Sequence, residues 1–282
     1  MLKNSLEEAL KRAYQMAIEQ LDRHSAQLVL DRDKKLTTEV ANLVVEIIHR
    51  HTVSDLYKDE VSASKREYPP TYKVRPIEAQ VTELRKCFPG LSSCNEKIAR
   101  RPLPEGAEDW FAVPRWQAVA PTYNEAVEKM VAVLATKRRF SNRIPERMGP
   151  RFLRQSQRLQ LAENILAEQQ QQADILVVAA QTGMMYRGCS ARRARVLMAG
   201  NEFGLGTFAM GCLLITHPER LSSLETLMID CSGDEYAFQG GLAYDRVPLF
   251  DYDLGGIEFS IFYEDRARNL WGTPTGFLFQ MH

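Results

Sequence analysis

The sequence predicts an α+β fold, with a helical N-terminal half and a C-terminal antiparallel sheet packed against helices. Through much of the first half, apolar residues recur at three- and four-residue steps, which is the period of an amphipathic helix. Near the C-terminus they alternate instead, as in Ile257, Phe259 and Ile261, which is the pattern of a strand with one packed face. The 282 residues are 45% hydrophobic and 26% charged, a composition typical of globular proteins.

An antiparallel pair of helices is expected over residues 1–53. One apolar stripe runs from Leu2 to Leu21, and a second runs from Val40 to Ile48. Two helices cannot bury both stripes by packing on each other alone. We therefore expect this pair to dock against another surface or to mediate oligomerisation.

Residues 54–76 are predicted to form an extended linker. Their charged first half is followed by Pro69, Pro70 and Pro76. Proline has no amide donor and its ring fixes the backbone, so neither a helix nor a central strand is expected here. The main body then comprises residues 77–282.

Local signals divide the main body into helices and strands. Thr122 and Glu125 have the spacing of a capping box, and Ser190 is a good N-cap for the segment that follows it. Pro150 suits the first position of a long helix that would reach about Gln171. Helices are thus expected at 77–88, 122–137, 150–171 and after Ser190, a short turn capped by Ser92 or Ser93, and strands at 110–113, 175–180, 227–230, 248–252, 256–263 and 275–280.

The charges of the chain are segregated. Residues 137–158 hold eight positive charges and one negative charge, although the 36 basic and 36 acidic residues of the whole chain cancel. Residues 219–268 hold eleven acids and only four arginines. Arg147, Arg151, Arg154 and Arg158 are spaced four, three and four residues apart, so they would share one exposed face if the predicted helix extends as far as Arg147. Such segregation indicates a binding partner rather than catalysis.

The basic segment predicts a non-enzymatic binding protein that presents arginines to a polyanion, with nucleic acid as the first candidate. The planar guanidinium suits phosphates, and the nearby Trp110, Trp116, Tyr123 and Phe140 could stack on bases. An alternative is a protein–protein interaction module, an inhibitor or assembly factor, that binds an acidic protein surface. A third interpretation is an ordinary solvated face, or pairing with the chain's own acidic segment. The predicted binding residues are Arg138, Arg139, Arg143, Arg147, Arg151, Arg154, Arg158, Arg192, Arg193 and Arg195.

A glycine motif suggests a second alternative, a nucleotide-cofactor-dependent enzyme. Gly204 and Gly206 open a G-x-G-x-x-A pattern that resembles a dinucleotide-binding loop or the glycine loop of an S-adenosylmethionine-dependent methyltransferase. Asp230 ends a predicted strand at the distance where an acid would bind a ribose hydroxyl. Too few residues follow for a doubly wound sheet, so close helix packing explains the glycines better. No cofactor is predicted.

The remaining candidates for chemistry are weak. Asp230, Asp234 and Glu235 could hold a cation, but Asp, Ser and Gly also favour ordinary exposed turns. His217 could serve Cys189 or Cys231 as a base, yet no family signature surrounds either cysteine. We predict no metal site and no catalytic residue. Five widely spaced cysteines and the lack of a long apolar run or secretory signal predict a cytoplasmic protein without a membrane span.

Overall fold

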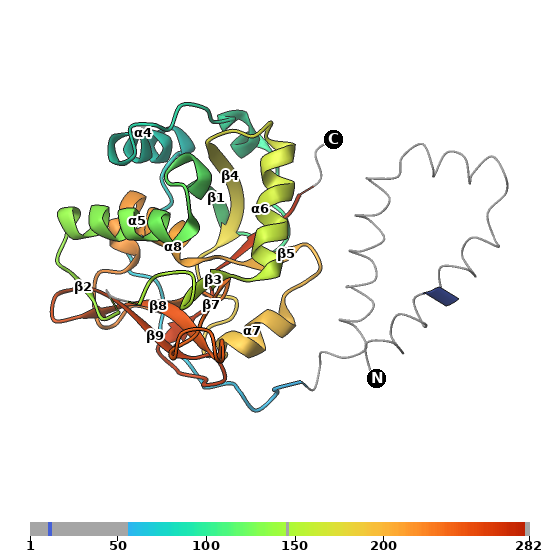
Figure 1. Ribbon diagram of the computed structural model, residues 1–282, viewed down its shortest axis with the longest axis vertical. Helices are drawn as coiled ribbons and strands as arrows, with labels where there is room; N and C mark the ends of the chain where they lie inside the picture. Colours follow the sequence, from blue (N-terminus) through green and yellow to red (C-terminus); the bar gives the residue numbers. More distant parts are fainter. Residues whose placement is uncertain (1–10, 13–55, 145–146, 280–282) are drawn as a thin grey trace. The chain divides into compact units, whose positions relative to one another are not determined.

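The computed structural model describes residues 11–12, 56–144 and 147–279 (Figure 1). The helical pair predicted over residues 1–53 therefore lies outside the described residues, apart from two positions. In the part that is described, no helix has both the length and the apolar composition needed to cross a bilayer.

The predicted α+β class is confirmed, because helices and two sheets share the body of the molecule. The helices are α4 (Ile77–Cys87), α5 (Tyr123–Lys137), α6 (Gln157–Gln169), α7 (Ala191–Leu197) and α8 (Thr207–Thr216), with short 3₁₀ turns η1 (Glu96–Arg100), η2 (Trp116–Ala118) and η3 (Pro218–Arg220). The strands are β1 (Asp109–Pro114), β2 (Phe140–Asn142), β3 (Leu153–Gln155), β4 (Ile175–Gln181), β5 (Glu202–Gly204), β6 (Met228–Asp230), β7 (Asp234–Tyr236), β8 (Arg246–Asp253), β9 (Gly256–Tyr263), β10 (Trp271–Gly272) and β11 (Thr275–Phe277).

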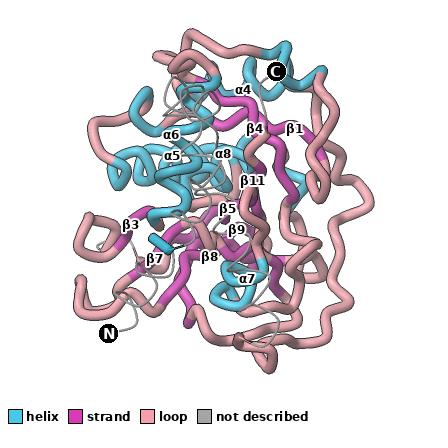
Figure 2. Tube along the Cα trace, turned by 90° about the vertical axis from the view of Figure 1, so that its right-hand side faces the viewer, coloured by secondary structure: helices cyan, strands magenta, loops and turns pink. Residues whose placement is uncertain are grey.

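Sheet 1 is antiparallel and has the strand order β1-β4-β11-β5. Strand β11 comes from the C-terminal end of the chain and lies between two strands from its middle. Helix α8 contacts β1 of this sheet and lies side by side with α5, and α6 contacts β4 and β5 (Figures 1 and 2).

Sheet 2 has the order β10-β6-β8-β7-β3, with β9 paired to β8 and β2 paired to β9. It is mainly antiparallel, with two parallel pairs, β10–β6 and β2–β9. The predicted turn between β8 and β9 is present, with Leu254 and Gly255 at positive φ angles of 46° and 81°. Most of this sheet is C-terminal, as the sequence predicts.

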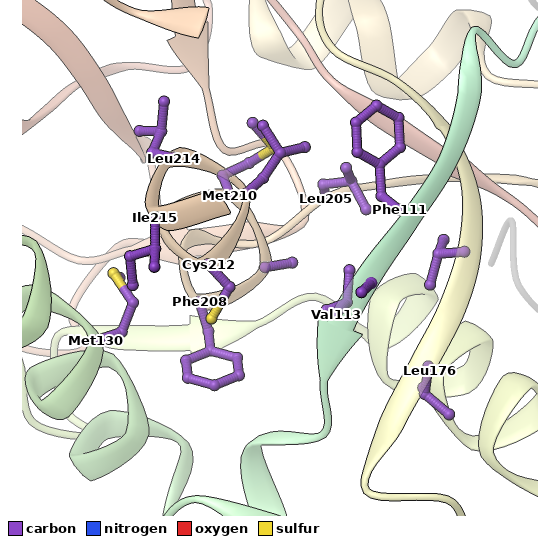
Figure 3. Packing of buried hydrophobic residues seen from close by; sticks show 14 of the residues in the cluster. Phe111, Val113, Met130, Leu176, Leu205, Phe208, Met210, Cys212, Leu214 and Ile215 are labelled. Carbon is purple, nitrogen blue, oxygen red and sulfur yellow. The ribbon is translucent and has the colours of Figure 1, made fainter. Parts of the chain in front are cut away.

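The core is centred on α8, whose ten residues are all buried. Phe208, Met210 and Leu214 contribute apolar side chains to the cluster shown in Figure 3, together with Val113 of β1. Met130 of α5 packs directly over Gly211, where a Cβ atom would stand only 1.9 Å from the Met130 sulfur. The glycine allows α5 and α8 to approach closely.

The predicted long helix over 150–171 is wrong in its first part. Residues Gly149 to Phe152 form a turn, in which the Phe152 and Leu153 amides donate to the Gly149 carbonyl. Residues 153–155 are β3, and α6 starts after Ser156, whose hydroxyl accepts from the Leu159 amide. Strand pairing to β7 buries Leu153 and Gln155 on alternate positions, and this tertiary contact overrides the helical spacing.

Most predicted helix starts are confirmed. The Glu125 amide donates to the Thr122 hydroxyl at 3.3 Å, and the Arg193 amide donates to the Ser190 hydroxyl at 2.9 Å. The cap predicted at Ser92 or Ser93 is wrong, because the short turn η1 starts after Asn95 and no side chain caps it. The Ser92 hydroxyl and the Ser92 and Ser93 amides donate to the Asp174 carboxylate instead. This bonding holds the pKa of the Asp174 carboxyl well below its usual range.

The segment predicted as a linker runs extended against the main body where it is described. The Ser62 amide donates to the Gly188 carbonyl at 2.7 Å, and the Leu227 amide donates to the Glu67 carbonyl at 3.0 Å. The Arg75 amide donates to the His217 ring at 3.0 Å. These contacts lie at both ends and in the middle of residues 62–75.

Candidate arginine-rich binding site

The ten arginines predicted to bind a polyanion do not form one continuous surface in the structure. Since β3 interrupts the predicted helix, the arginines at 147, 151, 154 and 158 do not share a helix face. They divide instead into arginines that hold the fold together and a smaller group that faces solvent.

Arg138 and Arg158 are half-buried and bind main-chain carbonyls. Arg138 donates to the carbonyls of Pro218 and Leu221, both at 2.8 Å. Arg158 donates to the Glu202 carbonyl at 2.7 Å and to carbonyls at the end of α7. Burial lowers the pKa of both guanidinium groups from their ordinary value. Arg138 thus contributes to the fold rather than to an outer surface.

The three arginines of α7 also turn toward their own chain. Arg192 pairs with Glu60 and lies over the Tyr57 ring. Arg193 is buried and donates to the Leu56 carbonyl. Arg195 donates to the carbonyls of Ser232 and Asp234 at 2.9 and 2.8 Å and pairs with Glu264. Through these arginines, α7 connects residues 56–60 with the turn 231–235 and with Glu264, which follows β9.

Two arginines lie beside the turn between β8 and β9. Arg143 of the loop after β2 pairs with Glu258 at 2.6 Å and reaches Asp253 at 3.9 Å. Arg139 is exposed, and its stem packs on Gly256. The acidic sheet therefore neutralises the charge of Arg143.

The remaining three, Arg147, Arg151 and Arg154, form what we call the arginine cluster. Arg147 and Arg151 precede β3, and Arg154 lies within it. The neighbouring strand β7 leads into the loop 237–245. The Arg147 guanidinium lies 5.0 Å from the centre of the Phe238 ring, and that of Arg154 lies 3.6 Å from the centre of the Tyr244 ring. The cluster therefore combines exposed cations with aromatic side chains from a second segment.

The charge of the arginine cluster is only partly cancelled. Arg154 pairs with Glu235 at 2.7 Å across the β3–β7 pair. Within the described residues, no ion pair engages Arg147 or Arg151, and both are exposed. Phe238 is 46% exposed, so part of its side chain remains accessible to a partner.

A cleft of about 700 Å³ adjoins the cluster, between the start of α6, the end of α7 and the turn 231–235. We call it the α6 cleft. Arg154, Arg158 and Arg195 line it, together with the α6 N-cap Ser156. The Ser232 side chain also lines it, and its buried hydroxyl has no hydrogen-bond partner. The cleft thus offers positive charge beside the solvent-facing arginines.

The glycine motif lies between a strand and a helix, as the pattern suggests. Other side chains of the protein fill the space that a cofactor phosphate would occupy. Gly204 ends β5 and Gly206 precedes α8. A Cβ atom on Gly204 would meet the Ser232 hydroxyl at 2.3 Å, and one on Gly206 would meet Asp234 at 2.8 Å. The Asp234 carboxylate already accepts from the Thr207 amide, at 2.7 Å, where a phosphate would bind. Close packing of two segments accounts for these glycines.

The candidate acids Asp230 and Asp234 and the candidate cysteines Cys189 and Cys231 are buried. Burial raises the pKa of Asp230 to about 7 and that of Asp234 to about 6. Burial also raises the pKa of the Cys189 and Cys231 thiols, so neither is a thiolate at neutral pH. The His217 ring accepts from the Arg75 amide and contacts the Thr216 hydroxyl, and burial lowers its pKa to about 4. These groups support the fold.

Sequence reasoning missed the aromatic part of the site. Of the aromatics it proposed for base stacking, Trp110 and Tyr123 are buried in the core. Phe238 and Tyr244 lie about ninety residues from the arginines that they meet. Their position in a glycine-containing loop was the available signal, but only the β3–β7 pairing shows which segment the loop would approach.

Comparisons with protein-family models, with curated proteins and with solved structures found no match to this chain. Function is therefore argued from the geometry and chemistry of the site.

Proposed function

We propose that the protein is a non-enzymatic binding protein whose arginine cluster holds a polyanion, and that this polyanion is single-stranded nucleic acid. One observation carries the proposal. Arg147 and Arg151 are exposed and have no ion-pair partner among the described residues, Arg147 lies against the half-exposed Phe238 ring, and Arg154 extends the cluster into a cleft that further arginines line.

The chemistry of the cluster favours a phosphate chain that carries bases. Guanidinium groups form forked hydrogen bonds to phosphate oxygens, whereas a lysine offers only a point charge. An exposed ring adds roughly 1–3 kcal/mol per stacked base in single-strand binding proteins, because every base has a flat face. The zero net charge of the chain means that attraction depends on this local arrangement rather than on the whole molecule.

We further place this binding in the cytoplasm, because an odd number of widely spaced cysteines suits a reducing compartment.

The test is binding of fluorescent single-stranded oligonucleotides, measured by anisotropy. The variant R147A/R151A/R154A should lose most affinity, and the slope of log K against log salt should shrink by about 2, since three contacts contribute roughly 0.7 each. A matched control removes three exposed cations elsewhere, in K73A/K97A/R100A, and should bind nearly as the wild type does. The variant Phe238→Ala should weaken binding while leaving the salt slope unchanged.

Two outcomes would refute the proposal. One is absence of oligonucleotide binding by the wild-type protein at low salt, in which case an acidic protein becomes the partner to seek with the same variants. The other is an equal loss of affinity in the two triple variants, because that would indicate general charge attraction without a site.

A further inference from the structure

A second, separate cavity lies between α6 and sheet 1. Its volume is about 240 Å³, which is far larger than the water-sized voids of ordinary protein interiors. Val113, Leu176 and Leu205, all labelled in Figure 3, contribute to its apolar wall, and Phe203 extends it. A cavity of roughly 150 Å³ lined by such residues is large enough to hold benzene. This one has room for a branched or aromatic group with a small polar head.

One charged group of the cavity is Glu163 of α6. Its carboxylate accepts from the Gln155 side-chain amide at 2.9 Å, and no ion pair engages it among the described residues. Burial, with the Asp234 charge nearby, raises the pKa of this carboxyl to about 7. An acid placed against an apolar wall without a cation is unfavourable for the empty protein, and a bound cation would relieve that cost.

The other charged group is Arg115, which follows β1. Its main-chain amide donates to the Asp174 carbonyl at 2.8 Å, so the backbone of the residue is fixed at the edge of the cavity. One terminal nitrogen donates to the Gln172 side chain, but the Nε group is buried and has no partner. No carboxylate pairs with this guanidinium among the described residues. A planar anionic group would satisfy it.

An acid, a base and an apolar wall within one small cavity match the three parts of one class of molecule. We propose that the cavity binds a free apolar α-amino acid as its zwitterion, with the ammonium group on the Glu163 carboxylate, the carboxylate on the Arg115 guanidinium, and the side chain against Leu176, Phe203 and Leu205. Removal of either charge from the ligand leaves one of the two protein charges without a partner, so discrimination against such analogues is expected. The site is distinct from the arginine cluster.

Calorimetry with three related ligands tests this assignment. They are leucine, 3-methylbutylamine, which lacks the carboxylate, and 4-methylpentanoate, which lacks the amine. The wild-type protein should bind leucine at least tenfold more tightly than either analogue. Valine, isoleucine and phenylalanine extend the series to other side-chain shapes. Absence of binding by all four amino acids at millimolar concentration would overturn the proposal, as would an analogue that binds as tightly as leucine.

Protein variants test whether Glu163 binds the ammonium group of the ligand and Arg115 binds its carboxylate. Glu163→Gln should weaken leucine binding at least tenfold and leave the affinity for 4-methylpentanoate unchanged. Arg115→Gln should weaken leucine binding and leave the affinity for 3-methylbutylamine unchanged. Ala167→Leu places a larger side chain at the cavity wall and should abolish binding of all three ligands, while oligonucleotide binding stays at the wild-type level. Each variant is checked for a cooperative thermal transition. Leucine affinity that is unchanged in both charge variants would overturn the assignment.

Discussion

At the scale of single residues, Glu163 should make the stability of the protein depend on pH. Its pKa of about 7 in the folded protein lies above the ordinary value of 4.5. Between these values the folded state binds a proton that the unfolded state does not bind, so stability falls as pH rises through this window and stays lower above it. Glu163→Gln removes the effect. We expect the variant to be more stable than the wild type by about 1–3 kcal/mol at pH 8 and nearly equal to it at pH 4.

Denaturant unfolding of both proteins at a series of pH values measures this difference. His217 acts in the opposite direction, because its pKa is lowered to about 4 and its protonation below neutral pH favours unfolding. Asp230 and Asp234 act in the same direction as Glu163, because burial raises the pKa of both carboxyl groups and stability falls as they lose their protons. All three are present in both proteins, so they largely cancel in the comparison. A difference in stability that does not change with pH would show that Glu163 is not buried as an acid.

Single residues also mark what a sequence can reveal. Thr122 and Ser190 were predictable as helix caps because each bonds an amide only three positions away. The partners of Arg154 and Arg158 were not, because Glu235 and the Glu202 carbonyl are 81 and 44 positions away in the chain. Spacing along a chain gives no information about such pairs until the strands that join them are known.

At the scale of elements, the contact between α5 and α8 depends on Gly211. A Cβ atom at this position would overlap three atoms of the Met130 side chain, at 1.9, 2.4 and 2.8 Å. Gly211→Ala should therefore destabilise the protein by about 1–2 kcal/mol, even though alanine favours a helix by roughly 1 kcal/mol over glycine.

A double-mutant cycle with Met130→Ala tests the mechanism. Met130→Ala alone leaves a cavity and should cost about 2–5 kcal/mol. If overlap is the cause, Gly211→Ala should be neutral or stabilising when Met130 is already alanine, because the helical preference then acts alone. Denaturation midpoints of the four proteins give the coupling energy. Simple additivity of the two changes would mean that the helices do not meet at this point.

Long strands are easier to predict from the sequence than short ones. The strands β4, β8 and β9 are seven or eight residues long and carry enough apolar residues to be predicted. The strands β3, β5 and β7 have three residues each, too few to show any period. Pairing with distant partners decides their conformation. This explains why the sequence predicts a helix around Arg154 and a single face for the arginines.

At the scale of the whole molecule, the segregation of charge in the sequence is partly cancelled by folding. Arg143 and Arg154 of the basic segment pair with Glu258 and Glu235 of the acidic sheet. The interpretation as pairing within the chain thus holds for part of the basic segment. Exposed cations without an ion pair remain at Arg147 and Arg151, and the proposed binding site combines them with the half-exposed Arg154.

This division predicts that salt will affect binding and folding very differently. The ion pairs of Arg143 and Arg154 have half-exposed arginine side chains, and such surface pairs contribute little, typically below about 1 kcal/mol each. Raising NaCl from 50 to 500 mM should therefore change the free energy of unfolding by no more than about 1 kcal/mol. Over the same range, three phosphate contacts predict a loss of oligonucleotide affinity of about 100-fold. Thermal or denaturant unfolding and anisotropy titrations in the same buffers measure the two effects. If stability falls as steeply as affinity, then the basic segment serves mainly to hold the acidic sheet, and the exposed arginines are not a binding site.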